Sequence, residues 1–190
     1  MAVHIIRKIM KAEQPLSKQV YSYSYFAIRS YERGGEYKRC HDDVILLSSQ
    51  GKGYYDKKSI VDRSCILNKY KVIITYAMSG GNKPSSKGDY QVISSLQILE
   101  PNEVCTETYL VLGAFDTLDK ARSMCSYVNT RTFRFLLLQA LTSIHITKDS
   151  FCFVPLQDFS KPWTDEELYA KYGLTQEEID FIESMIRPME

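Results

Sequence analysis

The chain has 190 residues, of which 44% are hydrophobic and 25% are charged, so it is long and apolar enough for one domain, with or without a smaller appendage. It has no run of about 18 apolar residues, which excludes a membrane-spanning helix. The first residues, MAVHIIRKIMKAEQ, lack the apolar stretch and cleavage site of a signal peptide, so a cytoplasmic location is expected.

The charge is unevenly distributed, although the net charge is only +1. Residues 29–90 carry twelve Lys/Arg against seven Asp/Glu, a balance of +5, whereas residues 158–190 carry three against nine, a balance of −6. This split predicts a basic surface for a polyanion and an acidic C-terminal segment that faces solvent or another basic surface. The alternative is ordinary solvated charge without a ligand.

The first 113 residues are predicted to be mainly β-strand, although residues 3–11 fit either a strand or a short helix. Tyr and Ser alternate from residue 21 to 25, the period of a half-buried strand, and this strand leads into a turn at Gly34 and Gly35. A glycine-containing loop or hairpin is expected over 49–59. Further strands are expected over 43–49, 69–77, 90–99, 106–115 and, nearer the C-terminus, 151–156.

Helices are predicted for most of the remaining chain. The segment 116–130 begins with an N-cap at Asp116 or Thr117, and 132–144 continues with apolar residues at helical spacing. Two short C-terminal helices each begin with a capping box, and a glycine ends the first of them. These signals are Thr164 with Glu167, Thr175 with Glu178, and Gly173. The predicted fold class is α+β, with a mixed or antiparallel β-rich core over residues 20–113 and helices packed after it.

The stretch KVIITYAMSGGNKPSSKGDY, residues 71–90, changes in its middle from an apolar run to a polar loop. Loops longer than about 12 residues are uncommon in compact domains and are usually functional or disordered. Lys83 and Lys87 indicate that any ligand of this loop is anionic.

The five cysteines and three histidines are scattered along the chain. No two cysteines have CxxC or CxxxxC spacing, so neither a zinc site nor a disulfide framework is expected. The cysteines are expected to be reduced thiols, most of them buried. Cys40 and His41 are adjacent, but neighbouring side chains on a strand point to opposite faces, which argues against a nucleophile paired with a base.

The sequence lacks the phosphate loop GxxxxGK[ST], the dinucleotide turn GxGxxG, HExxH and GxSxG. What remains is a set of basic residues interleaved with aromatic and hydroxyl residues on three predicted loops. Lys, Arg, Ser, Asn and Tyr contact phosphates, and Arg and Asn can also read guanine and adenine. The candidate DNA contacts are Arg29, Tyr31, Arg33, Lys38, Arg39, Asn82, Lys83 and Lys87, with Arg131 and Arg134 as further candidates for phosphate contacts or as helix-surface residues without a ligand.

The C-terminal run SFCFVPLQDFSKPWTDEELYAKYGLTQEEIDFIESMIRPM resembles the tail of bacterial restriction-modification adenine-N6 DNA methyltransferases in which the catalytic and target-recognition domains share one chain. Other pieces fit the same pattern, and the resemblance covers nearly the whole chain. These pieces are IIRKI, PLSKQV, SYFAIRSYERG, NKYKVIITYAMSGG and EPNEVCTETYLVLGAFDTLDKARSMCSYVNTRTFRFLL.

The resemblance implies a non-catalytic part of such an enzyme, because neither the FxGxG-like turn that binds S-adenosylmethionine nor the NPPY motif that holds the flipped adenine is present. S-adenosylmethionine is expected in a catalytic domain outside this chain. The chain is expected to be a C-terminal fragment or a free-standing specificity subunit. Residues 1–157 would form the target-recognition domain. Residues 158–190 would form a helical appendage packed on that domain or on the catalytic one.

The expected partners are double-stranded DNA and a catalytic methyltransferase domain or subunit, with no membrane. Two alternatives to DNA recognition by a methyltransferase stay open at this point. The chain could be an interaction module that docks onto a separate methylase or restriction subunit. It could also be a fragment of a bifunctional restriction endonuclease-methyltransferase.

Overall fold

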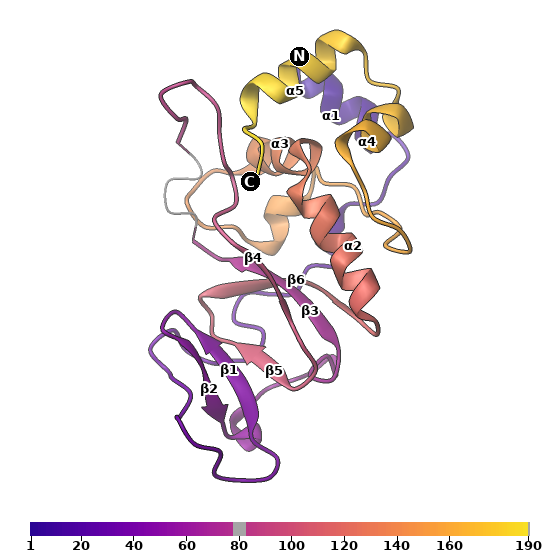
Figure 1. Cartoon of the computed structure of the whole chain (residues 1–190). Helices are drawn as coiled ribbons and strands as arrows, with labels where there is room; N and C mark the ends of the chain where they lie inside the picture. The colour runs from indigo at the N-terminus through magenta and orange to yellow at the C-terminus, as the bar shows by residue number, and fades with distance from the viewer. Residues whose placement is uncertain (78–82, 190) are drawn as a thin grey trace.

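The computed structural model describes residues 1–77 and 83–189, and in this part of the chain two three-stranded sheets and five α-helices form an α+β fold (Figure 1). The predicted fold class is therefore confirmed, including the two short C-terminal helices. The helices gather at one end of the molecule, one sheet lies in the middle, and the other sheet lies at the far end. None of the helices described is long and apolar enough to cross a membrane.

The two sheets differ in how their strands pair. In the first, β1 (Val44–Ser48) pairs antiparallel with β2 (Gly51–Tyr55) and parallel with β5 (Glu103–Cys105). In the second, β3 (Tyr70–Thr75) is antiparallel to both β4 (Leu96–Leu99) and β6 (Tyr109–Phe115). The strand β5 was not expected from the sequence, because three residues are too few to show a period.

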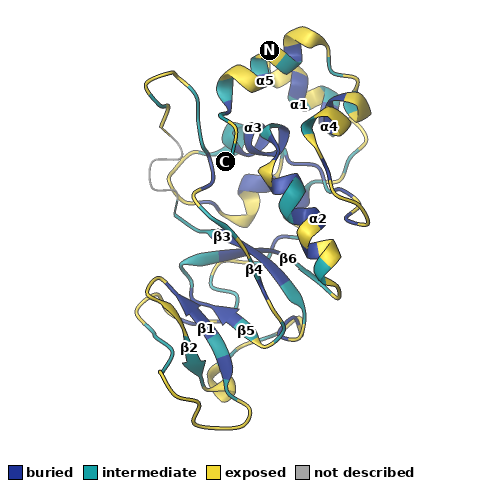
Figure 2. Ribbon diagram, in the orientation of Figure 1, coloured by how far each residue is buried: buried dark blue, intermediate teal, exposed yellow. Residues whose placement is uncertain are grey.

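Strands β3 and β6 are buried on both faces over most of their length, which explains their apolar runs, whereas β4 is buried only at Leu99. Val72 and Ile74 belong to the core beneath the helices, whereas Ile73 belongs to a second core shared with the β2-β1-β5 sheet. Figure 2 shows β3 and β6 mostly in dark blue, the colour of buried residues. The middle sheet is thus the layer that joins the helical end to the outer sheet.

Several helices begin and end where their sequence signals predict, but the helix expected over 132–144 ends at Ala140, because Leu141 adopts extended backbone. Thr117, Thr130, Thr164 and Thr175 each accept a backbone N–H with the side-chain hydroxyl, and the last two form complete capping boxes. Gly173 adopts φ +58°, the left-handed conformation that ends a helix. The helices are α1 (Ala2–Met10), α2 (Leu118–Asn129), α3 (Arg131–Ala140), α4 (Asp165–Tyr172) and α5 (Gln176–Met185).

The C-terminal helices pack against the N-terminal helix rather than standing apart (Figure 1). Ile5 and Ile9 of α1 share one apolar cluster with Leu168 and Ile182 of α4 and α5. The ammonium of Lys8 donates to the Glu178 carboxylate at 2.8 Å. The helices α4 and α5 therefore pack on the described N-terminal part of the same chain.

The strand expected from the alternation of Tyr and Ser is wrong. Residues 21–28 form a turn and irregular backbone, and Ser24 and Ala27 adopt φ +54° and +57°. The amide N–H of Ala27 donates to the carbonyl oxygen of Ser24 at 2.9 Å, which closes the turn. Phe26 and Ile28 are still buried, because their side chains fill the core between the two sheets. Alternation alone could not show that the segment lacks a partner strand.

Three smaller expectations also need correction. The run 90–99 forms a strand only over Leu96–Leu99. Residues 151–156 form no strand, since η3 (Lys148–Phe151) extends into them and Pro155 makes only an isolated bridge with Pro15. Most of the cysteines are not buried, because Cys40, Cys65 and Cys152 are exposed and only Cys105 is fully buried. All five are free thiols.

Lys71 lies in the interior of the β-rich part, with none of its surface exposed. Its ammonium donates to the carbonyl oxygens of Leu67, Lys69 and Glu100 at 2.9, 2.7 and 2.9 Å. Burial lowers the pKa of Lys71 to about 8, because the charged form is poorly solvated there. Through these hydrogen bonds, Lys71 connects the turn before β3 with the end of β4.

We expect this lysine to make the protein more stable as the pH rises from 7 to 9. The unfolded chain keeps the proton up to a higher pH than the folded one, so release in the folded state favours folding by about 1 kcal/mol over this range. The free energy of unfolding in urea at pH 7, 8 and 9 measures the effect, and Lys71→Met is the control that removes it. If the free energy of unfolding changes with pH in the same way in both proteins, the three carbonyl oxygens make up for the solvation that the Lys71 ammonium loses on burial.

The pKa values of two buried thiols limit the pH range in which the effect of Lys71 can be measured. Burial raises the pKa of Cys105 to about 12 and that of Cys125 to about 11. Their contribution is fully present below the unfolded thiol value of about 9 and is lost above it, because the unfolded thiols then ionise first. The free energies of unfolding of the unaltered protein and Lys71→Met are therefore compared only up to pH 9.

Candidate nucleic-acid interface

The turn that carries half of the predicted basic residues is fixed to the edge of the outer sheet. The backbone N–H of Gly35 donates to the carbonyl oxygen of Tyr54 on β2 at 2.7 Å, and the N–H of Tyr54 donates back at 2.8 Å. Gly34 lies so close to Gly53 that a Cβ on either residue would overlap the backbone of the other. Glycine is needed at both positions because two backbones approach closely here.

Some side chains of this turn are held by ion pairs or hydrogen bonds, and others are exposed. Arg29 pairs with Glu107 at 3.2 Å, and Arg33 donates to the carbonyl oxygens of its neighbours Ser30 and Glu32 at 2.5 and 2.7 Å. Tyr31, Lys38 and Arg39 are exposed. Among the described residues, neither Lys38 nor Arg39 has an ion-pair partner within 4.0 Å. Lys38 and Arg39 are therefore the cations of this turn best placed to meet a phosphate.

Two further lysines lie next to these cations. Lys57 and Lys58, on η2 (Lys57–Ser59), line a groove together with Cys40 and the carboxylates of Asp42, Asp43 and Asp56, and Arg39 lines the adjoining groove. We call Lys38, Arg39, Lys57 and Lys58 the hairpin cations. Carboxylates are also present, but Asp43 accepts the backbone N–H groups of Cys40 and Arg39, which lower its pKa, and Asp56 accepts the N–H of Lys58.

The third predicted loop lies elsewhere. Lys83 and Lys87 are exposed, but Asp89 pairs with Arg187 at 3.7 Å and Tyr90 bridges to Ile186, so this loop is fixed beside the end of α5. Figure 1 shows residues 83–90 near the C-terminus, whereas β2 and the turn bonded to it lie at the opposite end of the molecule. The predicted contact Asn82 lies outside the described residues. The structure thus separates the predicted residues into two groups.

The two arginines of α3 have different environments. Arg131 is half-buried and pairs with Glu183 at 3.1 Å. Arg134 is only 1% exposed, and its guanidinium donates to carbonyl oxygens inside the helical end. This interior position gives Arg134 no surface from which to reach a phosphate, so it is left out of the interface. A helical pattern of apolar residues around an arginine is the signal that could have indicated its burial.

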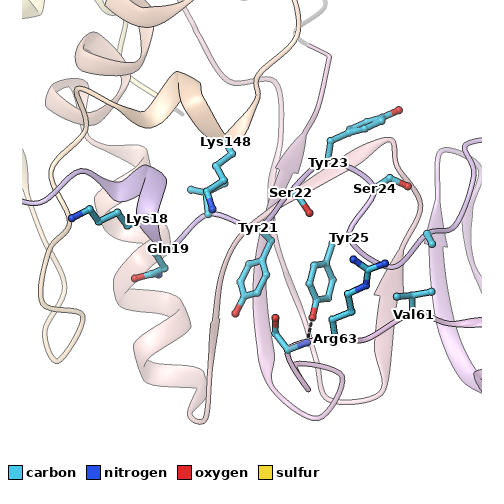
Figure 3. A pocket seen from close by; sticks show the side chains of 13 residues that line it. Lys18, Gln19, Tyr21, Ser22, Tyr23, Ser24, Tyr25, Val61, Arg63 and Lys148 are labelled. Carbon is cyan, nitrogen blue, oxygen red and sulfur yellow. Dashed lines mark hydrogen bonds between the residues drawn. The ribbon is translucent and has the colours of Figure 1, made fainter.

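An open cleft of about 730 Å³ lies between the two ends of the molecule (Figure 3). It is lined by residues 18–25 and Ala27, by Val61, Arg63 and Ser64, and by Lys148 of η3. The Tyr25 hydroxyl donates to the Asp62 carboxylate at 2.9 Å and accepts the N–H of Ser64 at 2.7 Å, which fixes one wall. Burial raises the pKa of both Tyr21 and Tyr25, so the two phenols stay neutral.

The cleft combines cations with aromatic and hydroxyl side chains. Lys18, Arg63 and Lys148 come from three separate segments, and Figure 3 shows Arg63 beside Tyr25. This arrangement was not predicted, since the tyrosines fitted a strand and the three cations are far apart in the chain. Only the interleaving of Tyr and Ser before the basic residues 29–39 could have drawn attention to it.

No family model, curated protein or solved structure matches this chain. The fold and the surface together define an α+β domain with exposed cations at one end and acidic helices at the other.

Proposed function

We propose that this chain is the DNA sequence-recognition domain of a restriction-modification adenine-specific DNA methyltransferase, and that it works in the cytoplasm without catalytic groups of its own. The observation that supports this most is the group of hairpin cations, which lie on the turn fixed to β2 and on η2, within the segment that has a charge balance of +5. Phosphate contacts of this kind hold a duplex in register while other side chains read base edges.

The charge distribution also suggests how the domain is oriented. The acidic helices α4 and α5 lie at the end opposite the hairpin cations (Figure 1). Phosphates would repel these helices, so we place them away from the DNA, on the side of the catalytic domain or subunit. That partner would bind S-adenosylmethionine and receive the extruded adenine, since the target atom cannot be reached inside a stacked duplex.

A salt titration of duplex binding tests this proposal. We expect labelled duplexes to bind with a Kd that weakens steeply with salt, and the double substitution Lys38→Glu with Arg39→Glu to weaken binding at least about tenfold and to reduce the salt slope by about 2. Fluorescence anisotropy with a mixed pool of duplexes measures both quantities.

The matched control is the double substitution Lys120→Glu with Arg122→Glu on α2. Both residues are exposed and the change in net charge is the same, but they lie away from the outer sheet. We expect this control to change binding by less than about threefold, because only non-specific charge is altered. Equal losses in the two variants, or no duplex binding at low salt, would count against the proposal and favour a docking module.

A further inference from the structure

Three aromatic rings lie in contact on the surface next to the cleft. The rings of Tyr23 and Tyr76 have centroids 4.3 Å apart with planes tilted by 36°, and the rings of Tyr76 and His145 are stacked, with centroids 4.9 Å apart and planes 21° from parallel. They come from three segments: the turn at 23–26, the end of β3, and the loop before η3. We call Tyr23, Tyr76 and His145 the aromatic row.

The backbone holds the aromatic row in place. The N–H of Tyr76 donates to the carbonyl oxygen of Thr108 at 2.8 Å, and the carbonyl oxygen of Tyr76 accepts the N–H of Ile146 at 2.9 Å. An isolated bridge between Ala77 and His145 continues this pairing. Tyr23 is 43% exposed and His145 is also exposed, so both ends of the row are accessible to solvent. The rings are therefore preorganised without being buried.

The aromatic row is continuous with the cleft. Tyr23 belongs to both, and Lys148 follows His145 by three residues and lines the cleft with Lys18 and Arg63 (Figure 3). The carboxylates of Asp62 and Glu107 lie close by, but both are engaged: Asp62 accepts the Tyr25 hydroxyl and the N–H groups of Ile66 and Leu67, and Glu107, beside Tyr23, pairs with Arg29 at 3.2 Å. A stack of accessible rings beside a groove of cations is the combination that binds single-stranded nucleic acid, because bases stack on the rings and phosphates follow the cations.

We propose that the aromatic row and the adjoining cleft bind an unpaired segment of nucleic acid. A base stacks against an exposed ring of the row, and the phosphates next to it lie against Lys148, Arg63 and Lys18. The volume of the cleft, about 730 Å³, falls within the range of pockets that hold small organic ligands, roughly 300–1,000 Å³. This inference depends on the rings and cations of the cleft alone and is independent of duplex recognition by the hairpin cations.

The test is anisotropy of a labelled single strand of about 12 nucleotides, a length within the range of known single-strand sites. We expect Tyr23→Ala to weaken binding about tenfold, as loss of one stacked base does, and Tyr23→Phe to leave it unchanged because the ring remains. Lys148→Glu is expected to weaken binding and lower its dependence on salt. Tyr37→Ala is the control, because Tyr37 is 75% exposed but lies outside the row.

A second arm uses the unaltered protein and so does not depend on how the variants fold. An abasic strand of the same length carries the same phosphates but no bases, and we expect it to bind at least about fivefold more weakly if stacking contributes. Equal binding of the abasic and natural strands, or equal losses in Tyr23→Ala and Tyr37→Ala, would overturn the proposal. The double substitution of Lys38 and Arg39 is expected to leave single-strand binding within about twofold, which separates this site from the duplex site.

Discussion

Replacing Arg134 by alanine is expected to lower the free energy of unfolding by about 3–4 kcal/mol. The guanidinium donates to four carbonyl oxygens, those of Thr130, Asn129, Gln91 and Arg187, at 3.3, 3.1, 3.4 and 2.7 Å. It therefore connects the junction of α2 and α3 with the segment before β4 and with the C-terminal tail. Alanine would remove all four guanidinium hydrogen bonds and leave a cavity where the side chain was. The carbonyls of Thr130 and Gln91 would keep the backbone N–H groups of residue 134 and Ile93 as donors, whereas those of Asn129 and Arg187 would lose the guanidinium.

The free-energy cost of burying the charge of Arg134 reduces the loss of stability expected for Arg134→Ala but does not cancel it. Burial lowers the pKa of Arg134 to about 10, so the side chain is still protonated at neutral pH and all its donors are available. Lysine is expected to restore only part of the stability, because a compact ammonium cannot reach four carbonyls that a planar guanidinium can.

Arg131→Ala is the matched control for Arg134, since it removes the same side chain one turn earlier on the same helix. Arg131 is half-buried and pairs with a carboxylate that is partly exposed, so its loss is expected to cost less than about 1 kcal/mol. Urea unfolding of the three variants and the unaltered protein measures both quantities. Similar costs for Arg131→Ala and Arg134→Ala would show that the carbonyl bonds of Arg134 contribute little.

Substituting Gly34 by alanine is expected to cost about 2–3 kcal/mol of stability and to weaken duplex binding at the same time. The added methyl group would overlap the backbone of Gly53, so the turn would have to move away from β2. That movement would break the pair of hydrogen bonds between Gly35 and Tyr54 and displace Lys38 and Arg39 from their positions beside η2. No charge changes in this variant, so a loss of binding would report the position of the turn alone.

Gly35→Ala is the control for this substitution. A Cβ at Gly35 would meet its nearest neighbours at 3.8 Å, an ordinary contact, so we expect a stability change below about 1 kcal/mol and unchanged binding. Urea unfolding and the anisotropy titration are measured on the same preparations. A Gly34→Ala protein as stable and as tightly bound as Gly35→Ala would mean that the close approach of the two backbones is easily relaxed.

Local signals in the sequence determined most of the helices and several of the strands. The capping boxes at Thr164 and Thr175 and the glycine at 173 depend on hydrogen bonds and backbone geometry within a few residues, so the same neighbours that give the signal also form the structure. The apolar runs of β3 and β6 likewise indicated buried strands, because β-branched and apolar residues favour a sheet covered on both faces.

The residues of the surfaces proposed to bind nucleic acid are brought together only by the tertiary structure. Arg131 and Arg134 look alike in the sequence, yet one is at the surface and the other is interior, because packing of the C-terminal tail surrounds only the second. The same holds for Tyr23, Tyr76 and His145, which lie at separate places in the chain and meet only when the turn at 23–26 folds beside β3. Contacts between distant segments leave no periodic signal, so residue type and spacing alone could identify neither the buried arginine nor the aromatic row.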